Sequence, residues 1–358
     1  MALHAGRLRL LLSVGRIVFI TQQVDPAHPA LAATVPKIVA LSALVDEVVV
    51  LADAAVDDVL PANCRVHTFR SGWKAGRGVR FETALAGELR GLRGGAVIAH
   101  MCPIYAVLAA PLVRPLDIPL VLWFTHWRAS PLLKLAERLS TTVASVDRRS
   151  FPLDSRKVKA IGHGIDLAEF PCVSPDPRQE LRLLALGRTS PAKGLDVVVR
   201  AVAEAGDGVR LDAHGPSLSD EERAHRADLE RLVRELGLEE RVRLGEAVPR
   251  ADVPQLFASH DALVNNMRAG APDKVVYEAA ASCVPVLASN PVFDSLLDPA
   301  QRFPRDDAAA LAERIRELAA LDAAARAAIG RALRERVEAR HSVETWARGI
   351  LTAAGVST

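Results

Sequence analysis

The sequence predicts an α/β protein built from two doubly wound, Rossmann-like parallel-sheet domains. Short apolar runs rich in β-branched residues alternate with longer amphipathic runs along the whole chain. Such alternation is typical of β-α-β units whose parallel sheet is buried on both faces. The alternation stops at the proline-rich segment 170–177 and then restarts, and a length of 358 residues fits two domains.

The first half of the chain contains six apolar runs that we interpret as buried strands, at 16–21, 47–51, 66–69, 96–99, 120–124 and 142–146. Helices are expected between them, for example over 29–44, 79–92 and 105–113. The apolar stretch 8–20 contains Arg9 and Arg16 and precedes no small-residue cleavage site, so it is not interpreted as a signal peptide. Three prolines, Arg114 and Asp117 exclude a membrane-spanning helix over 104–124. We therefore expect a cytoplasmic protein.

The second half repeats this architecture after the proline-rich boundary. Strands are expected at 181–186, 210–213, 242–244, 262–264 and 286–288, and helices at 194–205, 220–236, 251–259, 272–282 and in a tail from 306. The predicted domains are 1–170, completed by a C-terminal helix over 341–358, and 175–340. Ligands of doubly wound sheets bind at the carboxyl ends of the strands, which places the expected ligand in a cleft between the domains.

Composition narrows the class of function. The net charge of +2 and the aromatic content of 4% argue against a nucleic-acid partner. The four cysteines, Cys64, Cys102, Cys172 and Cys283, are scattered without a C-x-x-C pair. We therefore expect a reducing compartment, with neither a disulfide framework nor a zinc site. No D-x-D triplet occurs, so the sequence implies no divalent metal and no cofactor.

The first candidate site is the loop between the strand that ends at Gly187 and the helix that begins near Gly194. Arg188 and Lys193 lie on this loop, at the carboxyl end of the strand. Glycine allows close backbone approach to a ligand, and a helix N-terminus beside two cations suits a diphosphate. The alternative is a solvated loop with ordinary surface charges.

The second candidate site is the start of the helix after Gly270. Pro272 suits the first helical position, which places Lys274 and the amide of Val275 in the first turn, where an anion is favoured. Glu278 lies one turn later on the same face. Lysine before glutamate is the weaker orientation of an i,i+4 pair, so a structural salt bridge is a poor explanation of this pattern. A carboxylate there would accept two ribose hydroxyls.

In this order and spacing, these segments resemble retaining glycosyltransferases of the GT-B fold, specifically glycosyltransferase family 4. The matching pieces are 161–166, 184–188 with 193–194, 214–216, 273–279 and 284–286. The resemblance implies that Arg188 and Lys193 bind a donor diphosphate and that Glu278 binds the donor ribose. It also implies that Ala247 and Val248, in the segment 246–248, flank the base. Transfer would proceed with retention and without a protein nucleophile.

One position departs from the family pattern. Members often carry two glutamates eight positions apart, of which the first faces the donor sugar. The residue eight positions before Glu278 is Gly270. The identity of the donor sugar is therefore open, and Gly270 and Asp273 are the candidate positions beside it.

Histidines end two of the predicted strands in the first domain. His126 matches the position at which family members place a histidine against the donor sugar, and we take it as the catalytic candidate. The alternative for His126 is a satisfied histidine near the cleft, which is the preferred interpretation of His100. Gly162 and Gly164 are interpreted as hinge residues near the crossing between domains.

A basic stretch runs from Arg65 to Arg93, with Phe69 and Trp73 among its cations. The usual interpretation is a solvated helix face. The sharper one is a mobile acceptor loop that contacts an anionic substrate or the inner face of a membrane. Glycines at 72, 76 and 78 predict that the segment 71–78 is flexible.

The predicted function is transfer of a sugar from a nucleotide diphosphate donor to an acceptor that the sequence does not name: a lipid, a polysaccharide or a small molecule. Two alternatives stay open. One is a nucleotide-sugar epimerase of the same fold, and the other is a nucleotide-binding protein without turnover, an alternative that the glycine at 270 keeps open.

Overall fold

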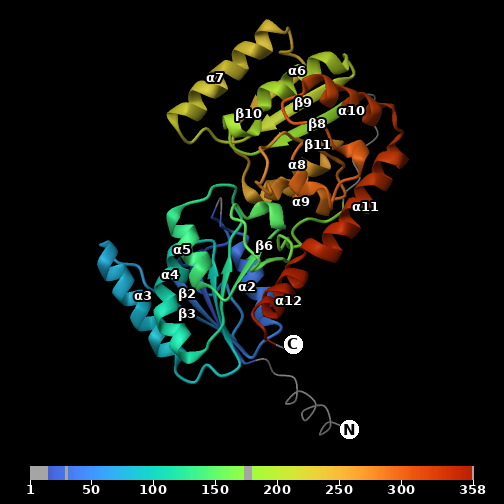
Figure 1. Ribbon diagram of the computed structural model, residues 1–358. Coiled ribbons are helices and arrows are strands. Elements are labelled where there is room, and N and C mark those ends of the chain that lie inside the picture. The colour runs from blue at the N-terminus through green and yellow to red at the C-terminus, as the bar shows by residue number, and fades with distance from the viewer. Residues whose placement is uncertain (1–14, 29–30, 173–179, 357–358) are drawn as a thin grey trace, which may run out of the picture. The chain divides into compact units, whose positions relative to one another are not determined.

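The computed structural model describes residues 15–28, 31–172 and 180–356. The chain divides into two compact units, Met1–Asp166 with Arg340–Thr358, and Leu167–Ala339. Figure 1 shows both units.

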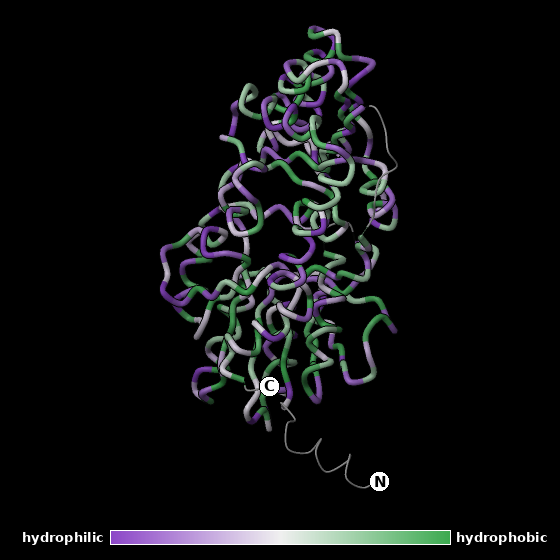
Figure 2. Tube along the Cα trace, turned by 90° about the vertical axis from the view of Figure 1, so that its right-hand side faces the viewer, coloured by the Kyte–Doolittle hydropathy of each residue, from purple (hydrophilic) through white to green (hydrophobic). Residues whose placement is uncertain are grey.

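The first unit is built on a seven-stranded parallel sheet with the order β3-β2-β1-β4-β5-β6-β7. Its strands are β1 (Arg16–Val24), β2 (Glu47–Ala55), β3 (Cys64–Thr68), β4 (Ala96–His100), β5 (Leu120–Trp123), β6 (Thr142–Ser145) and β7 (Val158–Ala160). Six of them overlap the predicted strands. The strand β7 was not predicted because only Val158 of its three residues is buried, so it leaves no apolar run. Figure 2 shows hydrophobic colour along the central strands of this sheet.

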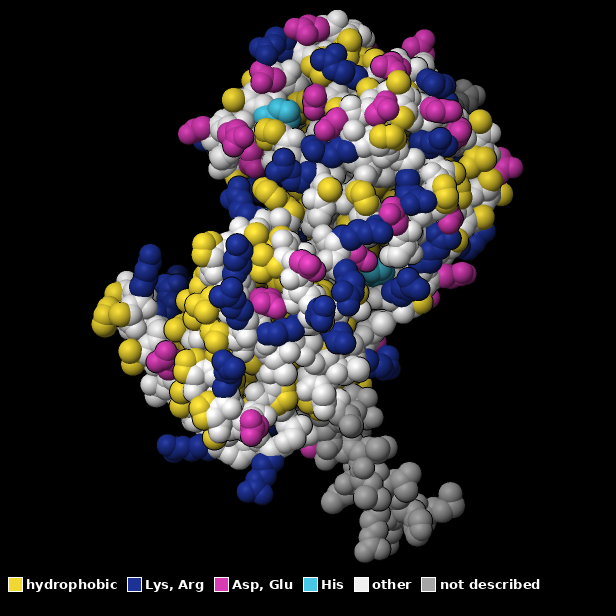
Figure 3. Space-filling model, viewed as in Figure 1, with side chains coloured by type: hydrophobic (Ala, Val, Ile, Leu, Met, Phe, Trp, Pro, Cys, Tyr) yellow, Lys and Arg dark blue, Asp and Glu magenta, His cyan; other side chains and the backbone are white. Residues whose placement is uncertain are grey.

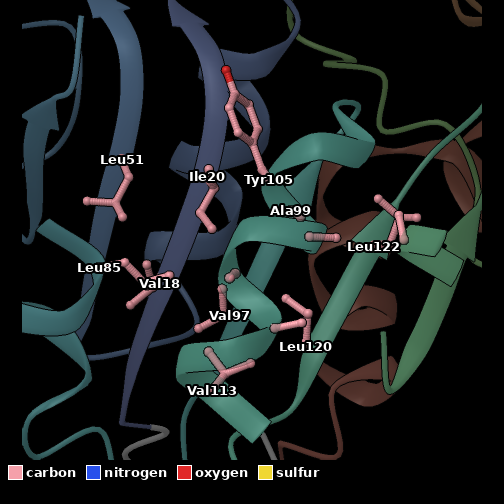
Figure 4. Packing of buried hydrophobic residues seen from close by; sticks show 14 of the residues in the cluster. Val18, Ile20, Leu51, Leu85, Val97, Ala99, Tyr105, Val113, Leu120 and Leu122 are labelled. Atoms are coloured by element: carbon pink, nitrogen blue, oxygen red, sulfur yellow. The ribbon is translucent and has the colours of Figure 1, made fainter. Parts of the chain in front are cut away.

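Helices cover both faces of this sheet. They are α2 (Thr34–Ser42), α3 (Lys74–Leu89), α4 (Pro103–Val113), α5 (Pro131–Leu139) and the C-terminal α12 (Val343–Ala353), with short 3-10 turns at Arg114–Leu116 and Arg148–Ser150. Alternate residues of β1, including Val18 and Ile20, pack with side chains of α3, α4 and α5 (Figure 4). On the opposite face, Trp346 of α12 lies 6.4 Å from Phe19 and 5.7 Å from Trp123 between ring centroids. The C-terminal helix thus completes the first unit.

The helix α3 begins earlier than predicted. Residues 74–78 are helical, so the prediction of a flexible segment over 71–78 is wrong for this part. The glycine at 76 serves packing: a Cβ atom there would lie 2.7 Å from Nε1 of Trp73. Glycine therefore lets the indole ring lie against the first turn of the helix.

The second unit contains a five-stranded parallel sheet with the order β10-β9-β8-β11-β12. Its strands are β8 (Leu181–Leu186), β9 (Val209–His214), β10 (Val242–Gly245), β11 (Ala262–Asn265) and β12 (Val286–Ala288). Its helices are α6 (Leu195–Ala205), α7 (Asp220–Glu235), α8 (Val253–Ala258), α9 (Lys274–Ala281), α10 (Ala308–Ala320) and α11 (Ala323–His341), whose last residues lead into α12. Short 3-10 turns include η4 (Pro191–Lys193) and η5 (Arg250–Asp252). All five strands overlap the predicted ones. The residues of β11 and β12 are buried throughout, whereas β9 alternates buried and half-buried residues.

The cysteines correct one prediction. Cys172 and Cys283 form a disulfide with Cα atoms 4.9 Å apart, whereas Cys64 and Cys102 are free. The two bonded residues are 111 positions apart in the sequence, and spacing alone gave no sign of their proximity. The bond fastens the segment that enters the second unit to the end of α9.

None of the helices within residues 15–28, 31–172 and 180–356 is both long and apolar enough to cross a membrane.

Candidate functional site

The candidate site lies at the carboxyl edge of the second sheet. The strand β8 sits between β9 and β11, so the segments that follow these strands are neighbours. Gly187 and Arg188 follow β8, and the loop 266–273 connects β11 to α9. A hollow at this edge is lined by Gly187, Lys193 and Asn265 among others, and a second hollow, which also borders Gly187, reaches His214.

Lys193 is held inside this edge by the turn η4. Its Nζ donates to the carbonyl oxygen of Leu186 at 3.2 Å and pairs with the carboxylate of Asp273. Asn265 also donates to Asp273, at 2.8 Å. Gly187 has φ 131°, and a Cβ atom there would lie 2.5 Å from Nζ of Lys193. Glycine at 187 is therefore needed for the lysine to occupy this place.

Arg188 extends from the same loop and is more exposed. Its guanidinium pairs with Oε1 of Glu222 at 3.1 Å, and Glu222 also accepts the amide N–H of Leu218 at 2.7 Å. A Cβ atom at Gly215 would lie 1.9 Å from the carbonyl oxygen of Gly187, so glycine there allows the loops after β8 and β9 to touch. Because 59% of its side chain is exposed, Arg188 remains accessible to an anion.

The helix α9 begins at Lys274, with Asp273 as its N-cap. The prediction that Pro272 is the first helical residue is therefore wrong, although Lys274 and Val275 do lie in the first turn. The orphan amides of that turn face the same edge of the sheet as Lys193, since Asp273 pairs with that lysine. Lys193 thus lies beside the N-terminus of α9, whose first turn contains Lys274, and this combination favours an anion.

Glu278 corrects a second prediction. Its carboxylate lies 3.2 Å from Nζ of Lys274, so the i,i+4 salt bridge that the sequence argument disfavoured does form. That argument considered only the order of the two charges along the helix, whereas only 4% of the Glu278 side chain is exposed. A buried carboxylate requires cations, whatever their helical order.

Arg250 is the second cation on Glu278, and the sequence analysis did not single it out. Its guanidinium donates to Oε1 of Glu278 at 2.6 Å and contacts Glu169 at 2.7 and 2.8 Å. Burial would lower the pKa of Arg250, but Glu278 and Glu169 raise it above its usual value. The only signal in the sequence was its position two residues after the segment predicted to flank the base.

That segment follows β10, with Ala247 exposed and Val248 half-buried. Arg226 of α7 donates to the carbonyl oxygens of Leu244 and Gly245 at 2.8 and 3.0 Å, and also pairs with Glu246 at 3.2 Å. These contacts fix the carboxyl end of β10 and the start of the exposed segment.

Gly270 has φ 80°, in the left-handed region that favours glycine. Its N–H donates to Oδ1 of the buried Asn290 at 3.3 Å, and Asn290 donates to the carbonyl oxygens of Arg268 and Ala271, both at 2.8 Å. A glutamate at 270 would be strained in this backbone conformation. Asp273 is the carboxylate that remains close by, and it is engaged with Lys193.

The remaining predicted residues lie in the first unit. His126 follows β5, is exposed, and accepts the N–H of Arg128 on Nδ1 at 3.0 Å. Partial burial and Arg128 lower the pKa of His126, so the ring is neutral at pH 7 with its proton on Nε2. His100 is buried and bonded to Thr21 at 3.4 Å, and burial holds its pKa well below the usual range.

Gly162 and Gly164 have φ 82° and 78°. A Cβ atom at 162 would lie 1.8 Å from the carbonyl oxygen of Arg340, and the N–H of Gly164 donates to the carbonyl oxygen of His341 at 3.0 Å. The structure thus gives both glycines a packing role within the first unit, and their hinge role stays a prediction. Nowhere in residues 15–28, 31–172 and 180–356 do three or more His, Cys, Asp or Glu side chains group in a way that could hold a metal ion.

The fold of this chain is similar to that of several solved structures. HepE from Anabaena in complex with UDP superposes with a TM-score of 0.74 at 21% identity, covering 95% of this chain and 99% of that one. Sucrose-phosphate synthase from Thermosynechococcus elongatus gives a TM-score of 0.73 at 19% identity, covering 94% and 98%. The chain has the GT-B fold. WaaG, a glycosyltransferase involved in lipopolysaccharide biosynthesis, gives 0.61 at 15% identity, covering 95% and 99%.

Sequence comparison adds one match. Residues 196–352, in the second unit and α12, match a family model described as glycosyl transferase-like. No curated protein sequence matches the chain significantly. The match includes Glu278 and Lys274, whereas Arg188 and Lys193 lie just before it.

Proposed function

We propose that this protein is a retaining glycosyltransferase of family 4 that takes a sugar from a nucleotide diphosphate donor bound at the carboxyl edge of the second sheet. The observation that carries the proposal is that Asp273, the N-cap of α9, pairs with Lys193, so that this lysine lies at the start of the helix. Lys274 lies in the first turn of the same helix and pairs with the buried Glu278 one turn further. Cations and helix amides suit a diphosphate, and a carboxylate suits a ribose. HepE, the GT-B neighbour described above, was crystallised with UDP and with UDP-glucose, so these are the first probes.

The proposed chemistry is departure of a nucleoside diphosphate from the anomeric carbon. The leaving phosphate gathers negative charge, which Arg188, Lys193 and Lys274 would stabilise. In this structure each of these cations is paired with a carboxylate of the chain. The donor phosphates would take the place of Asp273 beside Lys193. The sequence contains no D-x-D triplet, so we assign this stabilisation to cations of the chain and propose a metal-independent reaction.

The sugar end of the donor is assigned to two side chains. We propose that His126 contacts the donor sugar through its protonated Nε2, in keeping with the neutral tautomer that its Nδ1 contact favours. Asp273 would turn from Lys193 to a sugar hydroxyl once phosphate arrives. This exchange gives the site a carboxylate in the absence of one at 270.

A peripheral membrane contact is proposed for the exposed end of α3. No acidic residue occurs between Arg70 and Phe81, and Lys74 and Arg80 are exposed. Trp73 and Val79 are also exposed, at 65% and 62%. Figure 3 shows cationic and hydrophobic side chains together at this end of the helix. Such a combination binds anionic lipid surfaces, and the inner face of a membrane is the surface we propose.

Not all cations of the basic stretch 65–93 are available for a membrane contact. Arg65 is engaged by Glu88 at 2.8 Å and by Glu47 at 3.0 Å, so it belongs to an ion cluster of the sheet edge. Arg77 pairs with Asp53 at 3.2 Å. The proposed contact is therefore limited to the turns of α3 around Trp73, Lys74 and Arg80.

The function is tested by incubating the protein with UDP-glucose and other nucleotide sugars and measuring nucleoside diphosphate release without acceptor. We expect slow release from one donor, abolished in Lys193→Ala and retained in the surface variant Lys134→Ala. Nuclear magnetic resonance of the sugar distinguishes the epimerase alternative, which would change the sugar without releasing nucleotide. Tight binding of a nucleotide sugar, with neither nucleotide release nor epimerisation, would support the alternative of a binding protein, which is consistent with glycine at position 270.

A further inference from the structure

Arg250 occupies a fixed place beside the proposed ribose carboxylate. Its side chain is 19% exposed, and its guanidinium carbon lies 5.0 Å from the centre of the Phe170 ring. Phe170 is fully buried, and its carbonyl oxygen accepts from Arg334 at 2.6 Å. Glu169 takes two nitrogens of the same guanidinium, at 2.7 and 2.8 Å. The guanidinium plane is therefore set by groups other than Glu278.

This fixed guanidinium determines how the Glu278 carboxylate is held. Arg250 contacts Oε1 of Glu278 at 2.6 Å, and Lys274 contacts the same oxygen at 3.2 Å. Two cations on one oxygen compensate for the burial of the carboxylate and orient its plane. The other oxygen, Oε2, is then the one that can accept ligand hydroxyls.

The location of Arg250 connects this carboxylate to the base. Arg250 opens the turn η5, two residues after Val248 of the segment proposed to flank the base. Arg250 thus links the loop proposed to flank the base with the Glu278 carboxylate of α9. Side chains that hold a binding group in one rotamer by packing and hydrogen bonds raise the precision of a site.

Resting on the proposed donor site, we propose that Arg250 is a positioning residue that makes the site selective for ribonucleotides. It orients Glu278 so that Oε2 accepts the 2′ and 3′ hydroxyls of the donor ribose. A purely structural role, in which Arg250 only fastens Glu169 and Phe170 to α9, would leave this selectivity unchanged. The two roles therefore differ in one measurable ratio.

The experiment is calorimetric titration with UDP, GDP and ADP and with their 2′-deoxy counterparts. Hydrogen bonds to a charged group predict that wild-type protein prefers the best ribonucleotide by about 10- to 100-fold. In Arg250→Ala the ratio should fall below about threefold, while affinity for the 2′-deoxy nucleotide stays within about twofold of wild type. Arg250→Lys should restore part of the preference for the ribonucleotide, because a lysine can pair with Glu278 but cannot also form a bidentate pair with Glu169.

Two further variants complete the design. Glu169→Gln leaves Glu278 and Arg250 in place and should give an intermediate ratio, which keeps the test decisive if Arg250→Ala does not fold. Arg302→Ala removes an arginine paired with Asp294 at 2.8 Å elsewhere in the same unit, and should keep the wild-type ratio. The double variant of Arg250→Ala with Glu278→Gln should lose no more selectivity than either single variant.

The outcomes separate this inference from the proposed function. If Arg250→Ala keeps the wild-type ratio, or if both affinities fall by the same factor, the positioning role is wrong while the donor site stands. If wild-type protein binds none of the six nucleotides, the donor site is wrong and the role of Arg250 with it.

Discussion

Replacing Asp273 by asparagine should strengthen the binding of a nucleoside diphosphate. The Asp273 carboxylate pairs with Lys193 and accepts from Asn265 at 2.8 Å, at the place assigned to a donor phosphate. A diphosphate must therefore displace one carboxylate and then lie beside it. Asparagine keeps a carbonyl oxygen for the hydrogen bond from Asn265 and removes the charge.

The magnitude follows from the exposure of the pair. The side chains of Lys193 and Asp273 are 15% and 19% exposed, so the pair is stronger than the 0.2–1 kcal/mol of fully exposed pairs. We take about 1 kcal/mol as the part lost on phosphate binding, which corresponds to about a fivefold gain in affinity for UDP. The same substitution should lower the affinity for UDP-glucose relative to UDP, because Asp273 is assigned to the sugar.

Calorimetric titration of UDP and UDP-glucose into both proteins measures these two effects. Asp228→Asn is the matched control, since it removes one negative charge from an exposed position of α7 and should change neither affinity. Unchanged or weaker UDP binding in Asp273→Asn would show that the carboxylate does not compete with phosphate. The proposal that a donor phosphate takes the place of Asp273 beside Lys193 would then be wrong.

Three other predictions concern separate parts of the molecule. Replacing Cys172 and Cys283 by serine should lower the free energy of unfolding of the second unit by about 2–5 kcal/mol, measured by denaturant titration, whereas Cys64→Ser should have little effect. If the double serine variant is as stable as Cys64→Ser, the disulfide does not stabilise the unit. His126→Ala should reduce sugar transfer at least tenfold with UDP affinity unchanged, and full activity of the variant would remove His126 from the mechanism. Because the pKa of His126 is lowered, the activity of the wild-type protein should stay constant from pH 8 to 7 and fall only at acidic pH, as the ring protonates. Co-sedimentation with phosphatidylserine vesicles should be lost in Trp73→Ala with Lys74→Ala and weakened by salt, and retention by this variant would exclude the α3 contact.

Most strands of the two sheets were predictable from the sequence because buried parallel strands are rich in apolar residues, whereas β7, with one buried residue, was not. The runs at 181–186 and 286–288 coincide with β8 and β12. The start of α3 was not predictable in this way. Glycines at 76 and 78 suggested flexibility, whereas Gly76 makes room for the Trp73 ring, a contact that only the folded helix shows.

The candidate site was predictable where local chemistry is unusual. Lys193 and Lys274 were predicted as site residues because each is a cation at the start of a helix. In the structure Lys193 pairs with Asp273, and Lys274 pairs with Glu278. Pairings across long separations were not predictable. Arg250 reaches Glu278 and Glu169 from 28 and 81 positions away, and Cys172 reaches Cys283 from 111. No local pattern encodes such contacts, because they depend on how the elements pack.

A crystal structure of the protein with UDP tests the central claim most directly. The account predicts that the diphosphate lies against Lys193 and the first turn of α9, that Asp273 no longer pairs with Lys193, and that the ribose hydroxyls contact Glu278. UDP bound elsewhere, or bound there with the pair of Lys193 and Asp273 intact, would contradict it.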